Sequence, residues 1–255
     1  MFAEERRKRI LELLQERKKV RVNELAKLFN VSAVTIRKDL EQLEAAGALV
    51  RTHGGAVIPD HTRSEWGFFK KLSQQKQQKI RIARKAVEFI EEEDTIILDS
   101  SSTTYYIAEE IRKLGRIHLT VVTNNIFVAE RLVGIQGVEI IVLGGHMREN
   151  SLSLVGPWAL RHLEEIKVDK AFLGTMGFSP EKGFMTPSLV EADVKRTMIE
   201  AAGEVFIVTD SSKFKRGAFA VFAQAEDVDH LITDSGISRS VEKYLEEKGV
   251  DVIKA

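Results

Sequence analysis

Four polar segments of the chain carry side chains that could bind an anionic ligand. The first, Asp-Ser-Ser-Ser-Thr-Thr at residues 99–104, follows the apolar run 95–98 and precedes a helical pattern. Hydroxyl groups, backbone N–H groups and the N-terminus of a helix all favour a phosphate at such a turn. Thr-Asn-Asn at 123–125, Gly-Gly-His-Met-Arg at 144–148 and Thr-Asp-Ser-Ser-Lys at 209–213 also follow apolar runs. Each segment alone also fits a helix cap or a turn, so the prediction rests on the four together.

A fifth segment, residues 183–195, adds Glu191 and Lys195 at a spacing of four. Two interpretations fit this pair. Glu191 and Lys195 form a surface ion pair on one face of a helix, or both contact a polyol phosphate.

Seven short apolar runs alternate with helical patterns and must position these segments. They are residues 95–98, 119–122, 138–143, 170–173, 205–208, 231–233 and 250–253. Such alternation predicts an α/β domain with a mostly parallel sheet. Ligands of such sheets bind beyond the carboxyl ends of the strands. We therefore expect the polar segments to gather at one edge of the sheet.

The N-terminal part of the chain has a different pattern, typical of a helix-turn-helix. A helix is predicted over 4–16 and a short one ends near Phe29; Ser32 caps a third, which runs to Gly47. Because the third helix buries Ile36, Leu40 and Leu43, its first turns present small, polar and basic side chains outward. These are Ser32, Ala33, Thr35, Arg37 and Lys38. In a major groove Arg37 can reach guanine edges, and both cations can hold phosphates. The alternative is a small helical bundle with a charged surface.

Residues 49–57 place two β-like stretches around Gly54 and Gly55, as a hairpin does. Such a wing would place Arg51, His53 and Gly54 against the DNA backbone or the minor groove.

The charge distribution supports a polyanionic partner at the N-terminal end. Residues 1–86 hold 20 Lys and Arg against 10 Asp and Glu, whereas residues 87–255 hold 18 against 28.

The chain has no cysteine, which excludes disulfides, thiolate nucleophiles and Cys-based metal sites. It has no apolar run of the ~18 residues that span a bilayer and no signal peptide, so we expect a cytoplasmic protein with no membrane partner.

A linker is predicted at residues 58–72, followed by one helix over 73–92 that has a basic first half and an acidic end. This polarity opposes the helix dipole. Either the charges are screened by solvent, or Lys76, Lys79 and Arg81 face an anion. The aromatic residues Trp66, Phe68 and Phe69 are expected to dock the linker on a domain or a second subunit.

The pattern S-x-x-T-I-R-K-D-L-x-x-L-x-x-x-G-x-L-x-R-x-H-G-G-A over residues 32–56 resembles the signature of DeoR-type bacterial transcription regulators. The later segments are similar to the effector domain of that family, whose fold resembles ribose 5-phosphate isomerase. The resemblance implies an oligomeric repressor of carbohydrate-utilisation genes. It implies effector contacts at Asp99, Ser101, Ser102, Thr103, Asn124, Gly145, Glu191, Lys195, Asp210 and Lys213. Ser101 departs from members that have glycine there, which restricts the backbone.

These patterns predict a winged helix-turn-helix domain at 1–57, the linker at 58–72 and a Rossmann-like α/β effector domain at 73–255. The predicted partners are double-stranded operator DNA, a phosphorylated sugar and further copies of the chain, as a dimer or a tetramer. We expect no catalytic residue, no cofactor and no metal. The alternative is a phosphosugar isomerase-type enzyme with a DNA-binding appendage, in which Glu191 or Asp99 is the base.

Overall fold

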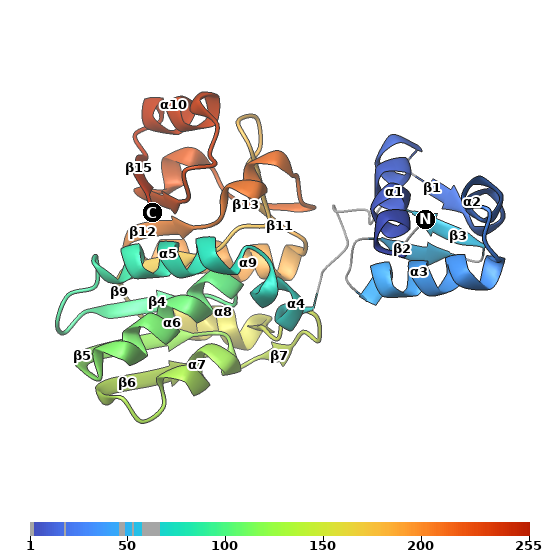
Figure 1. Cartoon of the computed structure of the whole chain (residues 1–255). Helices are drawn as coiled ribbons and strands as arrows, with labels where there is room; N and C mark the ends of the chain where they lie inside the picture. The colour runs from blue at the N-terminus through green and yellow to red at the C-terminus, as the bar shows by residue number, and fades with distance from the viewer. Residues whose placement is uncertain (1–2, 18, 46–48, 53, 58–66) are drawn as a thin grey trace. The chain divides into compact units, whose positions relative to one another are not determined.

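The computed structural model describes residues 3–17, 19–45, 49–52, 54–57 and 67–255 (Figure 1). The chain divides into two compact units, Met1–Asp60 and His61–Ala255. Each unit has its own hydrophobic core. No helix in the described ranges is long and apolar enough to cross a bilayer.

The described part of the first unit combines helices with a three-stranded antiparallel sheet in the order β1-β3-β2. Its elements are α1 (Ala3–Arg17), β1 (Lys19–Arg21), α2 (Val22–Phe29), α3 (Ala33–Ala45), β2 (Val50–Thr52) and β3 (Gly55–Val57). Asn30 ends α2 in the left-handed conformation, with φ of 52°, and so makes the tight turn into α3. The predicted winged helix-turn-helix is confirmed. Strand β1 was not predicted, and the predicted end of the third helix at Gly47 lies outside the described residues.

The core of the first unit contains the apolar residues that the helical spacing predicted on α3. Ile36, Leu40 and Leu43 are all buried. Beside them Asp39 accepts two hydrogen bonds from Arg6 of α1, one from Nε at 2.6 Å and one from Nη2 at 3.2 Å. Both side chains of this ion pair are buried, so it fixes α1 against α3.

The second unit is built on a seven-stranded sheet in the order β15-β14-β12-β9-β4-β5-β6, and all its strand pairs are parallel. Its strands are β4 (Thr95–Leu98), β5 (Arg116–Thr123), β6 (Gln136–Val142), β9 (Val168–Leu173), β12 (Ala202–Val208), β14 (His230–Thr233) and β15 (Asp251–Lys254). Each of the seven apolar runs of the sequence forms one of these strands. The predicted α/β class with a parallel sheet is confirmed.

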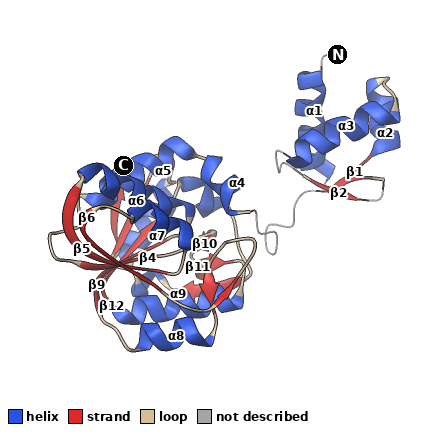
Figure 2. Ribbon diagram, turned by 90° about the horizontal axis from the view of Figure 1, so that it is seen from below, coloured by secondary structure: helices blue, strands red, loops and turns tan. Residues whose placement is uncertain are grey.

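Helices cover both faces of this sheet, as Figure 2 shows for α5, α6 and α7 on one side and α8 and α9 on the other. The helices are α4 (Phe68–Ser73), α5 (Lys76–Val87), α6 (Ser102–Leu114), α7 (Ile126–Leu132), α8 (Pro157–Glu164), α9 (Leu189–Ala201) and α10 (Arg239–Glu247). Successive strand residues alternate between the two cores. Ile96 and Leu98 of β4 pack under α5 and α6, whereas Ile97 packs on the opposite side.

Short elements complete the carboxyl edge of the sheet. An antiparallel sheet is formed by β10 (Gly177–Ser179), β11 (Gly183–Thr186) and β13 (Ala220–Ala223), and a hairpin by β7 (His146–Met147) and β8 (Leu154–Val155). Two 3₁₀ helices, η1 (Ser211–Lys215) and η2 (Ala225–Asp227), follow strands of this region.

The single helix predicted over 73–92 was wrong at both ends. The chain forms two helices, α4 and α5, which are separated at Gln75, a residue with a left-handed φ of 49°. Helix α5 ends at Val87, so the acidic residues 91–93 lie in the turns before β4 rather than in a last helical turn. Their charges therefore do not oppose the dipole of α5.

The predicted linker 58–72 includes most of α4, which the structure places in the second unit. Phe68 is buried there, with ring centroids 5.9 Å from Tyr105 and 5.8 Å from Phe127. The Tyr106 hydroxyl donates to the carbonyl oxygen of Leu72 at 3.1 Å. Phe68 thus docks on a domain as predicted; Phe69 is mostly exposed, and Trp66 lies outside the described residues.

Candidate functional site

A polar site lies where the order of the parallel sheet reverses. From β4 the chain proceeds to β5 and β6 on one side, whereas β9 and later strands extend the sheet on the other. Loops that leave the carboxyl ends of two such strands diverge and leave a crevice, which is the usual ligand site of an open α/β sheet. Here Asp99 follows β4 and Gly174 follows β9.

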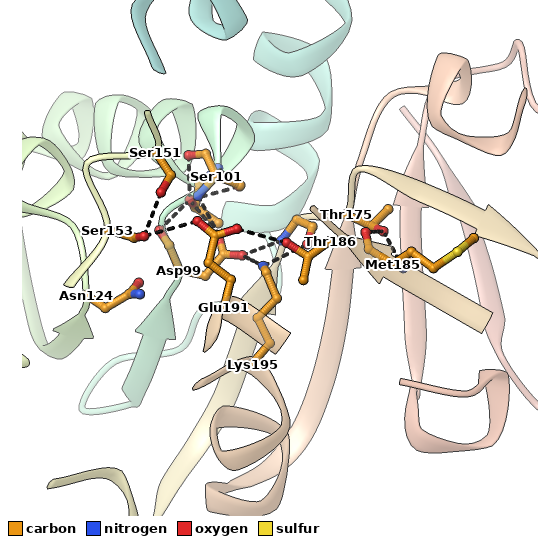
Figure 3. A network of polar contacts seen from close by, with 12 residues as sticks. Asp99, Ser101, Asn124, Ser151, Ser153, Thr175, Met185, Thr186, Glu191 and Lys195 are labelled. Atoms are coloured by element: carbon orange, nitrogen blue, oxygen red, sulfur yellow. Dashed lines mark hydrogen bonds and ion pairs between the residues drawn. The ribbon is translucent and has the colours of Figure 1, made fainter. Parts of the chain in front are cut away.

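Asp99 organises this crevice, and both its carboxylate oxygens are occupied (Figure 3). Its Oδ1 accepts from the backbone N–H of Ser101 at 2.9 Å and from the Thr104 hydroxyl at 3.0 Å. Its Oδ2 accepts from the N–H of Gly174 at 2.8 Å and from Nζ of Lys195. Asp99 therefore joins the ends of β4 and β9 and holds the Lys195 ammonium.

Ser101 caps helix α6 and fits against a glycine. Its Oγ accepts from the backbone N–H of Thr104 at 3.1 Å, a standard N-cap bond. A Cβ atom at Gly174 would lie 2.3 Å from the Ser101 Cβ, closer than real Cβ contacts come. The loop thus accepts serine at 101 because residue 174 has no side chain.

A pocket opens beside this crevice. Its lining is mainly hydroxyl and ammonium groups, contributed by loops and helices from several parts of the chain. The lining residues are Lys71, Lys79, Ser100, Ser101, Ser102, Thr103, Ser151, Gly174, Thr175, Met176, Thr186, Glu191, Lys195, Thr209 and Lys213.

The N-terminus of α6 supplies one wall of the pocket. Ser102 and Thr103 are its first helical residues, and both line the pocket. The first N–H groups of a helix have no partner within the helix, and the helix dipole favours a negative charge near them. This wall therefore suits an anion.

Four lysines from four different elements line the same pocket. Lys71 comes from α4, Lys79 from α5, Lys195 from α9 and Lys213 from η1. Lys79 is 2% exposed, and its ammonium donates to the carbonyl oxygen of Lys71. Lys213 lies 4.0 Å from the carboxylate of Asp210.

The pKa of Lys79 is lowered to about 7, chiefly by burial and also by the positive charges of Lys213 and Lys71, against the opposing effect of Asp210. Burial also lowers the pKa of Lys213, although Asp210 stabilises its charged form. The pocket thus holds ammonium groups in surroundings that only partly compensate their charge, and an anion would supply the missing compensation.

Glu191 is the one carboxylate among the lining residues, and it is fully engaged. Arg148 contacts its Oε1 at 2.5 Å, Ser153 donates to Oε1 at 3.1 Å and Thr186 donates to Oε2 at 3.0 Å. Burial alone would raise the pKa of Glu191, but Arg148, a hydrogen bond from Ser151 and two lysines lower it overall. Glu191 is therefore an ionised hydrogen-bond acceptor.

The structure gathers most of the predicted effector residues but not all of them. Ser101, Ser102, Thr103, Glu191, Lys195 and Lys213 line the pocket. Asp99 and Asp210 lie behind it, where each contacts a pocket lysine. Asn124 and Gly145 are absent from the lining residues. Asn124 is buried and donates to the Leu154 carbonyl at 3.1 Å, and Gly145 packs on Val155 with a φ of 141° that favours glycine.

The surface interpretation of the Glu191 and Lys195 pair was wrong. Both side chains are buried, and each pairs with a different partner, Arg148 for Glu191 and Asp99 for Lys195. Of the three cations that one of the two alternatives placed against an anion, only Lys79 lines the pocket. Lys76 and Arg81 are exposed.

The second candidate site is the outer face of α3 in the first unit. The Ser32 hydroxyl caps this helix by accepting from the N–H of Thr35 at 3.1 Å, and Arg37 and Lys38 are exposed beside it. Ala33 was predicted to face outward, but it is half-buried against the core because it lies on the inner side of the first turn.

On the wing, Arg51 and Gly54 are exposed, and the Arg51 guanidinium lies 3.8 Å from Glu44. Gly54 adopts a φ of 133°, which favours glycine at this turn. His53 lies outside the described residues.

Sequence reasoning missed several residues of the pocket, among them Lys71, Ser151 and Thr175, and one exposed side chain on α3. Lys71 was assigned to a linker, because α4 has only six residues and is too short to show a repeating helical pattern of apolar residues. Val34, on the outer face of α3, was passed over as an ordinary apolar residue, yet it is 58% exposed.

Two family models match the chain. The DeoR-like helix-turn-helix domain matches residues 6–62, and the DeoR C terminal sensor domain matches residues 74–235. YulB of Bacillus subtilis, an uncharacterized HTH-type transcriptional regulator, is 38% identical over 99% of this chain and 96% of its own length. A putative aga operon transcriptional repressor of Escherichia coli O157:H7 is 38% identical over 98% of this chain and 93% of its own. The transcriptional repressor GlcR of Bacillus subtilis is 32% identical over 99% and 96%.

Solved structures resemble the chain more distantly. Ribose 5-phosphate isomerase A from Methanocaldococcus jannaschii is 15% identical over 55% of each chain, with a TM-score of 0.40. The β subunit of eIF2B from Chaetomium thermophilum is 14% identical over 83% of this chain and 70% of its own, with a TM-score of 0.42.

Proposed function

The chain belongs to the DeoR family of helix-turn-helix transcriptional regulators, and we propose that it represses a carbohydrate-utilisation operon under the control of a phosphorylated sugar. Residues 1–57 bind the operator, and the α/β domain, including α4, binds the sugar phosphate. The observation that carries the proposal is the pocket in which four lysines and the N-terminus of α6 converge on hydroxyl-rich walls.

The phosphate group occupies the end of the pocket formed by Ser102, Thr103 and the lysines. Helix N–H groups, hydroxyls and ammonium groups are the donors that a phosphate dianion accepts from. Lys71, Lys79 and Lys213 add charge from elements that are far apart in the sequence. This clustering of positive charge favours a dianion over a neutral sugar, because the charged hydrogen bonds of ammonium groups to a phosphate are stronger than those to a neutral hydroxyl.

The sugar occupies the end of the pocket near Glu191. Thr175, Thr186 and Ser151 line this part together with the Glu191 carboxylate. Such groups donate and accept hydrogen bonds in the alternating manner that the hydroxyls of a sugar require. Asn124 and Gly145, which are implied by the family resemblance, act in this proposal by supporting the neighbouring loops.

Ligand binding acts on the DNA through α4. This helix is the first described element after residues 58–66, and its Lys71 lines the pocket. A ligand changes operator affinity only if it binds one arrangement of the domains or subunits more tightly than the other. A phosphate held by Lys71 favours the docked position of α4, and the linker carries this preference to the helix-turn-helix.

The enzymatic alternative takes Asp99 or Glu191 as its base, and neither carboxylate is free in this geometry. Both oxygens of Asp99 and both oxygens of Glu191 already accept hydrogen bonds or ion pairs. The pKa of Glu191 is also lowered, which weakens it as a proton acceptor. Incubation with ribose, fructose and hexosamine phosphates should therefore give no product, and turnover of any of them would favour the enzyme.

Binding of both partners can be tested with the full-length protein. A thermal-shift screen against phosphorylated sugars should show one that raises the melting temperature, because a ligand selective for the folded state stabilises it. The same compound should change the affinity of the protein for its operator duplex in a fluorescence anisotropy titration. A compound that stabilises the protein and leaves operator binding unchanged would contradict the proposed control.

DNA binding by residues 1–57 predicts a steep fall of affinity with salt, because Arg37 and Lys38 neutralise phosphates. Arg37→Ala should cost about 1–3 kcal/mol on the operator if Arg37 contacts a base edge. An equal loss on random duplex would make it a phosphate contact. We also propose a homo-oligomer, a dimer or a tetramer, which sedimentation analysis would detect.

A further inference from the structure

Val34 is an exposed apolar residue on a helix face that is otherwise polar and charged. It is 58% exposed, whereas Ile36, Leu40 and Leu43 of the same helix are 0–7% exposed. A single exposed valine needs no explanation on an ordinary surface. On α3 it occupies the face that the helix-turn-helix presents to DNA.

The position of Val34 relative to the two cations is fixed by the helix. Lys38 lies four residues later and Arg37 three residues later, so both are neighbours of Val34 on the helix surface. Both are exposed. The hydrogen bond between the Ser32 hydroxyl and the N–H of Thr35 fixes the first turn, in which Val34 lies. Val34 therefore lies in the first turn of α3, and Arg37 and Lys38 lie in the next turn.

The chemistry of the major groove offers one apolar feature to such a side chain. Each base pair presents hydrogen-bond donors and acceptors there, and thymine alone adds the C5 methyl group. A valine has no donor or acceptor, so its sequence information can come only from this methyl group. Its β-branched side chain has few rotamers and loses little freedom on contact.

We propose that Val34 contacts the methyl group of a thymine in the major groove and so helps to specify the operator sequence. The inference rests on the DNA-binding function proposed above. It assigns to Val34 a role distinct from that of Arg37 and Lys38, because a methyl contact adds no charge and changes sequence preference without changing the salt dependence of binding.

The test combines a protein change with a base change. A preferred duplex is first selected from random sequences with the full-length protein. Each thymine is then replaced in turn by deoxyuridine, which lacks only the methyl group. The affinities of the wild-type protein and Val34→Ala for each duplex are measured by fluorescence anisotropy. Leu28→Ala serves as the matched control, because Leu28 is also 58% exposed in the first unit but lies on α2.

At one thymine per recognition helix, deoxyuridine should weaken wild-type binding roughly fivefold, the effect of one buried methyl group. Val34→Ala should weaken binding to the thymine duplex by a similar factor and should be insensitive to deoxyuridine at that position. Leu28→Ala should keep the wild-type sensitivity. The salt dependence should be the same for Val34→Ala and the wild type.

The proposal is overturned if Val34→Ala remains as sensitive to deoxyuridine as the wild type, or if no thymine methyl group affects wild-type binding. Failure of the wild-type protein to select any duplex would instead remove the DNA-binding function on which the inference rests. The two failures are distinguishable, because the second appears before any variant is made.

Discussion

Replacing Lys79 with methionine should weaken the pH dependence of phosphate binding. Lys79 is 2% exposed, and its pKa is lowered to about 7, chiefly by burial. The charged groups around it are Lys213 and Asp210 at η1 and Lys71 on α4. Without a ligand, its ammonium and neutral amine forms therefore interchange near neutral pH. A phosphate dianion beside the amine would favour the ammonium form.

The magnitude follows from this pKa. About one pH unit above 7, roughly nine tenths of Lys79 is neutral in the free protein. Binding of a phosphate that restores the charge then takes up close to one proton. The affinity should fall about tenfold for each further pH unit, until the pKa of the bound form is reached.

The titration of Lys79 should also change the stability of the free protein with pH. The trend is opposite to that of the phosphate affinity, because the stability rises as the pH rises. The unfolded chain keeps the Lys79 proton up to the ordinary pKa of 10.5, whereas the folded protein loses it near 7. Between these values the unfolded state binds more protons, so the free energy of unfolding rises with pH, by at most about 5 kcal/mol. Below about pH 7 the full cost of burying the charge is present. Lys79→Met should lack this rise.

Isothermal titration calorimetry in buffers of different ionisation enthalpy measures the proton uptake directly. Inorganic phosphate, or the sugar phosphate found by screening, would be titrated between about pH 6 and about pH 9. The titration of the phosphate itself is common to all variants and cancels in the affinity ratio of wild type to variant. Lys76→Met is the matched control, because Lys76 is an exposed lysine on the same helix. The reasoning is refuted if the wild type takes up no proton at the alkaline end, or if Lys79→Met shows the same pH dependence.

Three further substitutions test the structure. Gly174→Ala should lower the free energy of unfolding by about 1–3 kcal/mol in urea, because its Cβ would clash with Ser101; Ser101→Gly should recover part of that loss, and no recovery would contradict the clash. Asp39→Ala should lower the free energy of unfolding of the first unit by about 3–5 kcal/mol, because it removes the carboxylate that pairs with the buried Arg6. DNA binding should then be lost, while calorimetry shows normal phosphate binding. A stable variant would show that the pair is dispensable. Ser102→Glu should abolish phosphate binding and leave operator affinity unchanged, provided that circular dichroism shows it folded; a normal response to the sugar phosphate would place the phosphate elsewhere.

The fold could be predicted in large part because each strand of the parallel sheet is a short apolar run. Residues 95–98 are bounded by polar residues on both sides, so the end of β4 and the start of the ligand loop were visible in the sequence. The direction of the strands then placed Asp99 and Asp210 at the same edge. In α3 the spacing of Ile36 and Leu40 separated the buried face from the exposed face.

The lysines of the pocket could not be assigned in this way, because their burial is decided by packing between elements. Lys76 and Lys79 are equivalent in the sequence, three residues apart in a basic helix, yet only Lys79 points under α4 to the pocket. The spacing of Glu191 and Lys195 fits a surface pair equally well. Their burial depends on Arg148 and Asp99, which lie far away in the chain.

The place of α4 has a consequence for how such regulators exchange parts during evolution. The matched sensor domain begins at residue 74, but the pocket wall begins earlier, with Phe68 packed on Tyr105 and Lys71 lining the cavity. A recombination event that joined a foreign DNA-binding unit at residue 74 would discard that wall and uncover the Phe127 ring. A recombination junction before Gly67 would keep this part of the pocket with the sensor domain. Hybrids that keep residues 67–73 with their own sensor should therefore retain their response to the ligand when the DNA-binding unit is replaced.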